Sequence, residues 1–430
     1  MIVCVPKVFA STFTVNQSGD AGDLTCDATC TLRDAVQAAN ASPSGDTILF
    51  VPNVSTVVLT SEIVIANNGS LTITGAGADT QVIDGGSGTN RIFWINPNAV
   101  VAITDVTLTG GNGTGGTFHK DGGAVYSNSA SLTLDRVYVA GNSSDNWGGG
   151  VAIEGGSNNR ILNSTIAQNS AVSACGGFYS TGPVTVVNSI ISGNSTTFAG
   201  GGGLCNFSTM VLRNVTVTGN VSPNPGGISQ QSGNLNLGNT IVAGNTSTNN
   251  QQHEIYVASA GGVTSAGNNL IGSSAGRSTN TFNAIAYQGT DLRDVSPQFI
   301  NIGYYGGKTP TVPLQYGSPA RDTGSNALAI DPSNGNAAIT SDERGPGFAR
   351  SVNATGGAAR VDIGAFEIQD VRYYVTQYFV TLPAGACDDA CYLREAITAV
   401  PAGGIVDFDG FSHQPRRSMS EVARSSLIKA

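Results

Sequence analysis

Short runs in the middle of the chain alternate apolar and polar residues. In Val184-Thr185-Val186 the apolar positions are two residues apart, and the neighbouring runs follow the same spacing. A period of two is that of a β-strand with one buried face, and the Val, Ile and Thr in these runs favour strands. The pattern therefore predicts short strands, in which Ile166 faces the interior and its neighbour Thr165 faces out.

The runs recur with a fixed period, and an asparagine ends each of them. Five such asparagines are separated by 27, 25, 26 and 25 residues. A period of this size is typical of a solenoid, and stacking pairs each strand with its copy ~4.8 Å away in the next coil. We therefore predict an all-β fold, a right-handed single-stranded parallel β-helix (a pectate-lyase-like solenoid) from about residue 48 to about residue 275. The five residues, called the anchor asparagines below, are Asn142, Asn169, Asn194, Asn220 and Asn245.

A second set of asparagines lies six residues before the anchors. Each bend of a coil needs a residue that tolerates a positive φ, and Asn and Gly do so at the lowest cost. Stacked asparagines can also hydrogen-bond along a ladder, so both columns are interpreted as structural, with contact to carbohydrate as the alternative. Asp105 and Arg136 occupy the same column in earlier coils. This corner column continues with Asn163, Asn188, Asn214 and Asn239.

A short amphipathic helix is predicted ahead of the repeats, over residues 32–39. Thr31 followed by Asp34 forms a capping-box pattern, and Leu32, Ala35 and Val36 then fall on one helical face. The first coil of a solenoid must be covered, because its open edge would otherwise pair with other chains. We expect this helix to be the N-terminal cap.

The cap motif carries a family resemblance. Residues 26–36 (CDATCTLRDAV) and 45–50 (GDTILF) resemble the start of CSLREA-domain proteins, with Thr31, Asp34 and Val36 as mild departures. The glycine pairs and Asn-ended strands are similar to the repeats of polymorphic outer-membrane proteins. Three later segments, 317–324, 340–345 and 361–367, resemble the C-terminal region of choice-of-anchor Q proteins. The resemblance implies a bacterial surface β-helix.

Composition and motifs together divide the chain into four segments. Residues 1–12 are interpreted as a truncated signal-like segment, with an edge strand as the alternative, and 13–275 as the cap and the β-helix. Residues 276–367 form a lobe that closes the solenoid. Residues 372–430 repeat the cap motif and then lose all strand pattern, which indicates a truncated second cap module with a disordered tail outside the folded body.

Charge and cysteine usage narrow the function classes. The net charge of −9, with no basic patch in the body of the chain, argues against nucleic acid, and no apolar run reaches the ~18 residues of a transmembrane segment. Close pairs at Cys26/Cys30 and Cys387/Cys391 indicate local disulfides, with zinc as the weaker alternative. Cys175 and Cys205 lie at different offsets from the glycine pairs, so a bridge between them would need a register shift and is disfavoured.

Candidate chemistry is sparse in the coils. Asp105, Asp135 and Arg136 are the candidate catalytic cluster, with a surface salt bridge as the bland interpretation. Residues 119–121 (His-Lys-Asp) stand in the turn between these coils. A sugar-stacking surface is a second candidate, formed by Tyr126, Asp145 and Trp147.

The C-terminal part of the sequence concentrates charged residues in an otherwise neutral chain. They are Asp322, Asp342 and Asp362, together with Arg344 and Glu367. We interpret them as a paired network closing the last coil. Calcium is the alternative, since Ca²⁺ prefers oxygen ligands; no other cofactor is expected.

The expected function follows from these residues and the resemblance. It is a secreted or cell-surface, non-catalytic adhesive or carbohydrate-binding module, located outside the cell or on its outer surface. The expected partners are polysaccharides or host and cell-surface glycans. The alternative is a polysaccharide lyase or glycoside hydrolase acting on an acidic polysaccharide, because parallel β-helices host both classes.

Overall fold

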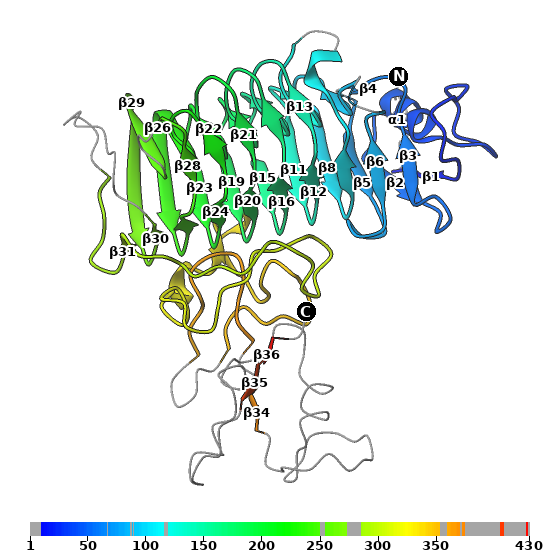
Figure 1. Ribbon diagram of the computed structural model, residues 1–430. Coiled ribbons are helices and arrows are strands. Elements are labelled where there is room, and N and C mark those ends of the chain that lie inside the picture. The colour runs from blue at the N-terminus through cyan, green and yellow to red at the C-terminus, as the bar shows by residue number, and fades with distance from the viewer. Residues whose placement is uncertain are drawn as a thin grey trace, which may run out of the picture.

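A computed structural model shows a rod of stacked parallel strands with a lobe along one side (Figure 1). It describes residues 10–66, 68–86, 88, 90–115, 119–249, 254–272, 285–352 and 359–369, together with the backbone of three short strands further on. Strands that follow one another in the chain pair with the equivalent strands of the next coil, and this pairing is parallel throughout the rod. The predicted parallel β-solenoid is confirmed.

The coils supply strands to four faces, which we number in chain order within a coil; in the described part of the chain, only the middle coils have a strand on the fourth. The first face contains β4 (Ile63–Ile65), β7 (Phe93–Ile95), β10 (Val125–Asn128), β14 (Val151–Glu154), β18 (Phe178–Ser180) and β22 (Leu204–Asn206). The second contains β1 (Thr12–Val15), β2 (Asp46–Phe50), β5 (Ser70–Thr74), β8 (Val100–Thr104), β11 (Ser131–Asp135), β15 (Asn159–Leu162), β19 (Val184–Val187) and β23 (Met210–Arg213). The long strands β26 (Ile228–Gly238) and β29 (Ile255–Gly267) continue both faces.

The other two faces complete the coil. The third contains β3 (Thr56–Val58), β6 (Val82–Asp84), β9 (Thr107–Thr109), β12 (Tyr138–Ala140), β16 (Thr165–Ala167), β20 (Ile190–Ser192), β24 (Thr216–Thr218), β27 (Ile241–Val242), β30 (Leu270–Ile271) and β31 (Leu292–Arg293). The fourth is short: β13 (Ser143–Ser144), β17 (Ser170–Ala171), β21 (Ser195–Thr196), β25 (Val221–Ser222) and β28 (Thr246–Ser247). Because β31 pairs with β30, the stack extends beyond residue 275 into the segment expected to be the lobe.

Side chains that point inward form one continuous core along the rod. Val139 pairs in register with Leu108 on one side and Ile166 on the other, and all three are fully buried. The glycine pairs lie where the fourth face returns to the first. A Cβ on Gly176 would lie 2.3 Å from the Ser195 carbonyl oxygen and 2.5 Å from that of Gly202, so only glycine fits between the coils there.

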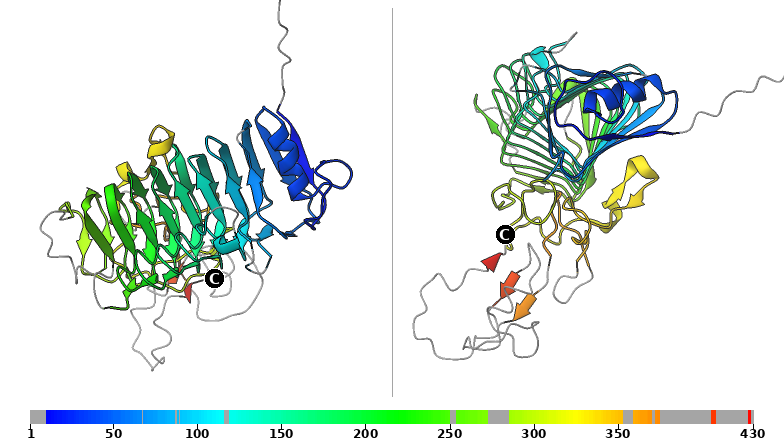
Figure 2. Two further views of the ribbon diagram at one scale, coloured as in Figure 1. Left: turned by 90° about the horizontal axis from the view of Figure 1, so that it is seen from above. Right: turned by 90° about the vertical axis from the view of Figure 1, so that its right-hand side faces the viewer.

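The N-terminal cap is the helix α1 (Leu32–Ala41), two residues longer than expected. Thr31 and Asp34 form the predicted capping box, and Leu32, Ala35 and Val36 are buried against the first strands. Seen along the rod, the helix lies across the end of the stack (Figure 2, right). The loop before it carries the expected disulfide between Cys26 and Cys30.

The two asparagine columns have different physical roles. The corner column is left-handed from Asp105 to Asn239, for example φ 57° at Asp105, 53° at Arg136 and 46° at Asn163. At the anchors the left-handed residue is the one before the asparagine, such as Gly193 with φ 65°. The idea that every asparagine serves the bend is therefore wrong for the anchors, whose side chains turn inward instead.

The anchor asparagines form a buried ladder along the rod. Asn169 donates from Nδ2 to Asn194 Oδ1 at 3.0 Å, and Asn194 donates to Asn220 Oδ1 at 2.9 Å. Each amide also donates to a backbone carbonyl of the preceding coil, as Asn194 does to Ile166 at 2.9 Å. At the far end Asn245 donates to Glu254 at 2.6 Å. The structural interpretation of this column is confirmed.

The C-terminal lobe lies along the third face and does not close the end of the rod (Figure 1). It contains η2 (Asn326–Leu328), β32 (Ile330–Asp331), η3 (Pro332–Asn334) and β33 (Ala337–Ala338), while η1 (Gly113–Gly115) belongs to the rod. Ile241 and Leu270 on the third face pack against lobe residues such as Phe366. Contacts run from Asp79, paired with Lys308 at 2.9 Å, to Asn268, which donates to the Thr323 carbonyl.

The lobe overturns one expectation about exposure. Thr165 does point away from the core, but it is fully buried, and its hydroxyl donates to the Pro310 carbonyl at 2.7 Å. The sequence offered a signal for this cover, because the equivalent outward positions in later coils, Ile190 and Ile241, are apolar where an exposed strand would be polar.

Most of the expected second cap module, including Cys387 and Cys391, lies outside the described residues. Of it the structure gives β34 (Arg372–Tyr374), β35 (Ile405–Asp407) and β36 (Leu427–Ile428). The first two pair in parallel, as β1 and β2 do beside the first cap.

Ile166→Asp should destabilise the rod by about 4 kcal/mol or more, because it places an unpaired carboxylate between apolar rungs. Thr165→Asp should also destabilise it, since that side chain lies under the lobe beside Glu343. Thr72→Asp, on the outer side of the second face, should cost little. Urea denaturation of the three variants checks this ranking, and a harmless Thr165→Asp would mean that the lobe does not cover the third face.

Asn194→Ala should cost about 2–4 kcal/mol, because it leaves buried partners in two neighbouring coils without hydrogen bonds. Ser195→Ala, one residue further on, is the matched control and should change stability by less than about 0.5 kcal/mol. The free energies of unfolding of both variants decide the matter. Equal values would show that the ladder does not contribute to stability.

Candidate functional site

The charged cluster predicted from the sequence comes together at one corner of the solenoid. Arg136 Nε lies 2.7 Å from Asp105 Oδ1, and its Nη2 lies 2.8 Å from Asp105 Oδ2. Its Nη1 donates to Asp135, whose other oxygen accepts from Asn163 at 2.8 Å. All three guanidinium nitrogens are therefore directed at carboxylates, one from the same coil and one from the coil before.

This pairing decides what the cluster can do. The hydrogen bond to Asp105 is the largest cause that raises the pKa of Arg136 above its ordinary value, and the charges of Asp105 and Asp135 act in the same direction. An arginine held protonated in this way cannot accept a proton from a sugar. The geometry is that of a partly exposed ion-pair network, which contributes little to stability.

The three residues of the predicted sugar-stacking surface do not share one exposed face. Tyr126 is fully buried and stacks on Trp94 with the ring centroids 4.5 Å apart. Asp145 is exposed and lies 3.5 Å from Lys120. Trp147 is half-buried. The expectation fails for Tyr126 because the loop that leaves the fourth face folds back over the outer side of the first face.

Aromatic rings form a stripe beneath these loops. Trp147 packs on Phe207, with ring centroids 5.3 Å apart, and meets the edge of Tyr179 at 4.9 Å. Burial raises the pKa of Tyr179 to about 12, so its phenol is neutral at physiological pH. The stripe is chiefly the packing surface for the loops, with the half-buried Trp147 and Phe207 at its outer edge.

The folded-back loops also correct the expectation for Cys175 and Cys205. These cysteines form a disulfide, with the Cα atoms 5.4 Å apart. Cys205 faces outward from β22, and Cys175 lies in the loop above that face with φ 63°. The bridge joins a loop to a strand of the next coil, so it needs no shift in the register of the stacked strands.

Sequence reasoning placed His119 and Asp121 in a turn beside the Asp105–Arg136 cluster, but it missed that they meet Glu154 at the start of the stripe. His119, Asp121 and Glu154 have donor atoms that all lie within 4.8 Å of one another. Glu154 is one of only three carboxylates between residues 132 and 250, and the others are Asp135 and Asp145. That scarcity was the available signal, but the sequence could not show that the loop around His119 folds over β14.

A buried ion pair underlies this group. Arg91 Nη1 lies 2.5 Å from Glu62 Oε2, and the other nitrogens of Arg91 donate to the backbone carbonyls of His119, Asp121 and Gly122. Burial lowers the pKa of Arg91, although the neighbouring carboxylates oppose the shift. The guanidinium thus fixes the backbone of the loop rather than reaching its side chains.

The three C-terminal carboxylates proposed as calcium ligands each have protein partners. Asp342 accepts from Arg344 Nη2 at 2.6 Å and from the Glu367 backbone N–H at 2.9 Å. Asp362 accepts backbone N–H groups of Asp322 and Ile368, both at 2.7 Å. The Asp322 carboxylate is partly exposed and lies 3.3 Å from Arg321 Nε. Asp342 and Asp362 belong to a buried hydrogen-bonded network within the lobe, and the described residues there include no group of three carboxylates converging on one point.

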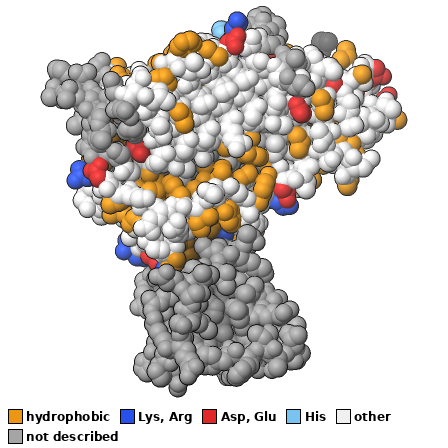
Figure 3. All heavy atoms as spheres, in the orientation of Figure 1, with side chains coloured by type: hydrophobic (Ala, Val, Ile, Leu, Met, Phe, Trp, Pro, Cys, Tyr) orange, Lys and Arg blue, Asp and Glu red, His pale blue; other side chains and the backbone are white. Residues whose placement is uncertain are grey.

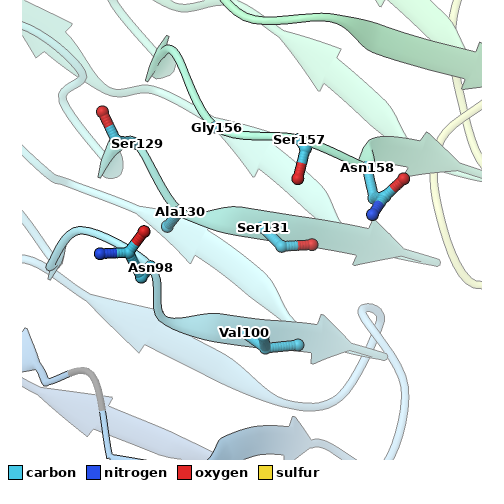
Figure 4. Close-up of a pocket in the computed structure, with 8 residues that line it drawn as sticks. All are labelled: Asn98, Val100, Ser129, Ala130, Ser131, Gly156, Ser157 and Asn158. Carbon is cyan, nitrogen blue, oxygen red and sulfur yellow. The ribbon is translucent and has the colours of Figure 1, made fainter.

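A shallow hollow of about 540 Å³ lies at the corner between the first and second faces, across three successive coils (Figure 4). It contains no ionisable side chain. A Cβ on Gly156 would lie 1.8 Å from the Ala130 carbonyl oxygen, so this glycine allows the coils to approach at the floor of the hollow. The lining residues are Asn98, Val100, Ser129, Ala130, Ser131, Gly156, Ser157 and Asn158.

Comparisons with family models, with curated proteins and with solved structures find no match to this chain. The resemblance to CSLREA-domain and choice-of-anchor Q proteins therefore stays a prediction. No helix in the described part of the chain is long and apolar enough to cross a membrane.

Glu343→Gln should make stability less dependent on pH. Burial is the main cause that raises the pKa of Glu343 from 4.5 to about 8. Between these values the unfolded chain releases the proton and the folded chain keeps it, so the stability of the native protein falls as pH rises through this window. A neutral Gln removes that loss. As the pH rises from 4.5 to about 8, the free energy of unfolding of the variant should therefore increase by roughly 1–3 kcal/mol relative to that of the native protein.

Denaturation curves at several pH values measure this difference. Asp27→Asn, which changes an exposed carboxylate, is the control and should run parallel to the native protein. A Glu343→Gln curve parallel to the native one would contradict the buried, protonated state of Glu343.

Proposed function

We propose that this protein is an extracellular, non-catalytic β-helix module that binds the hydroxyl groups of uncharged glycans. The observation that carries the proposal is the hollow at the corner of the first and second faces. Its walls present hydroxyl and amide groups from three coils of a rigid stack, which suits a chain of sugar units running along the rod.

The polar side chains of the hollow are available to a ligand. Asn98, Ser129 and Asn158 are exposed corner residues with φ of 63°, 50° and 57°. In the described part of the chain their side chains, like those of Ser131 and Ser157, make no hydrogen bond to other protein groups. Ser157 and Asn158 point toward the strand that carries Ser131 (Figure 4). Hydroxyls and amides both donate and accept, as sugar hydroxyls require.

The hollow is lined by uncharged side chains, which favours neutral ligands over charged ones. An acidic polysaccharide would be recognised by Arg or Lys, and neither lines this surface. Most of the rod surface visible in Figure 3 is likewise uncharged. We therefore favour neutral polysaccharides, or neutral portions of host and cell-surface glycans, as partners.

An extracellular location fits the cysteines. The disulfides Cys26–Cys30 and Cys175–Cys205 of the described residues would not persist in a reducing cytosol. The location on the outer cell surface and the bacterial source rest on the family resemblance.

The alternative, a lyase or hydrolase acting on an acidic polysaccharide, has less support. Its candidate base, Arg136, is locked between Asp105 and Asp135. An assay of the purified chain on a panel of neutral and acidic polysaccharides, with and without calcium, separates the alternatives: release of reducing or unsaturated ends would overturn the binding-module proposal.

Ser131→Trp should fill the hollow and reduce glycan binding at least tenfold, as measured by calorimetry on a neutral polysaccharide selected from a glycan array. Ser70→Trp is the matched control, because Ser70 holds the equivalent strand position two coils away and lies outside the hollow. Equal affinities of the two variants would place the glycan elsewhere. Failure of the native protein to bind any glycan of the array would overturn the proposal itself.

A further inference from the structure

One group of side chains on the rod has no role in the proposed glycan binding. It consists of His119, Asp121 and Glu154. His119 and Asp121 belong to the loop that follows η1, whereas Glu154 is the last residue of β14 in the next coil. His119 Nδ1 lies 3.9 Å from Asp121 Oδ2, beyond hydrogen-bond distance, and the donor atoms of all three residues lie within 4.8 Å of one another. An imidazole nitrogen and two carboxylates thus surround a single point.

Asp121 is held by contacts that leave one of its carboxylate oxygens facing this point. Asp121 uses Oδ1 to accept from the Trp147 backbone N–H at 2.8 Å and from Asn146 Nδ2 at 2.7 Å, while Oδ2 faces His119. These bonds fix the plane of the Asp121 carboxylate before any ligand arrives.

Tyr126 orients the other two members of the group. Its hydroxyl donates to Glu154 Oε2, and its ring stacks on His119 with the centroids 5.1 Å apart and the planes 10° apart. Such outer contacts are what orient ligands in metal sites.

The charges of the group also call for a cation. Two carboxylates lie close together here, the buried Asp121 and the half-buried Glu154. The nearest basic side chains have other partners. Arg91 pairs with Glu62, and Lys120 lies 3.5 Å from the exposed Asp145. A divalent ion would balance the two negative charges, with which neither Arg91 nor Lys120 forms an ion pair in the described part of the chain.

We propose that His119, Asp121 and Glu154 bind a divalent transition-metal ion, with Zn²⁺ the best fit. One imidazole nitrogen and two carboxylate oxygens are donors that zinc accepts in tetrahedral sites, with water able to fill a fourth position. Calcium fits less well, because it takes six to eight oxygen ligands. The ion would link the loop of one coil to the strand of the next. The residues of this site are distinct from those of the glycan-binding hollow, so either proposal can fail alone.

The test uses the full chain, free of any affinity tag and treated with a chelator. Calorimetry with ZnCl₂ should show one ion bound per chain, and zinc should raise the melting temperature by several degrees. His119→Ala should weaken zinc binding at least tenfold and abolish the thermal shift. This variant is safe for folding because the His119 side chain is 49% exposed. Glu154→Gln should weaken binding in the same way.

Asp145→Asn is the matched control, since it removes a nearby carboxylate that is not part of the group, and it should bind zinc as the native protein does. CaCl₂ and MnCl₂ are the comparison titrations, and calcium should bind at least tenfold more weakly than zinc. Three results would overturn the proposal: no zinc bound by the native protein, full binding retained in His119→Ala, or calcium preferred to zinc. Retained binding would place the ion elsewhere in the chain.

Discussion

The ladder of anchor asparagines is the interaction on which the rod depends. Each coil must turn sharply where the third face meets the fourth, and such a turn buries backbone groups that have no partner within their own coil. The side chains of Asn169, Asn194 and Asn220 supply those partners. Each side-chain amide donates hydrogen bonds to the anchor asparagine of the next coil and to a backbone carbonyl of the preceding coil. A single unpaired member would leave buried polar groups in two coils, so the period of the sequence is fixed by this column more strictly than by the apolar residues.

The last asparagine of the ladder, Asn245, has a carboxylate as its hydrogen-bond partner. Asn245 would present an unused amide, but Glu254 folds in and accepts from the Asn245 side chain and from the Asn245 and Gly244 backbone N–H groups. Burial is the main cause that raises the pKa of Glu254 to about 7, and the three hydrogen bonds oppose it. Glu254 and Glu343 therefore both favour a protonated or partly protonated folded state near neutrality, and both make the molecule more stable in mildly acidic solution than at higher pH.

The elements that the sequence predicted are those that repeat. The strands, the anchor asparagines and the contact between Asp105 and Arg136 follow from equal spacing along the chain, because stacking converts equal spacing into proximity. The cap helix is predicted separately, from its Thr31–Asp34 capping box and its apolar face. The contacts that were not predicted from the sequence are those that the stacking of coils does not produce. Thr165 is covered by a lobe from far along the chain, Cys175 reaches Cys205 through a loop, and Tyr126 lies beneath another loop. Their partners lie in segments without a period, so only indirect signs of these contacts are present in the sequence, such as apolar Ile190 and Ile241 on an outer side.

The same division explains where chemistry is found on this molecule. The interior and the ladder require nearly identical residues in every coil, so these positions cannot vary to form a binding site. Residue types can vary at the corners and in the loops. The hollow lies at a corner, where exposed Asn98, Ser129 and Asn158 vary over a constant backbone, and the group of His119, Asp121 and Glu154 lies where one loop folds over a strand. A metal ion there would tie a loop to the rod as the Cys175–Cys205 disulfide does further along. On a solenoid of this kind, cross-links between a loop and the next coil are the means by which segments without a period acquire a fixed position.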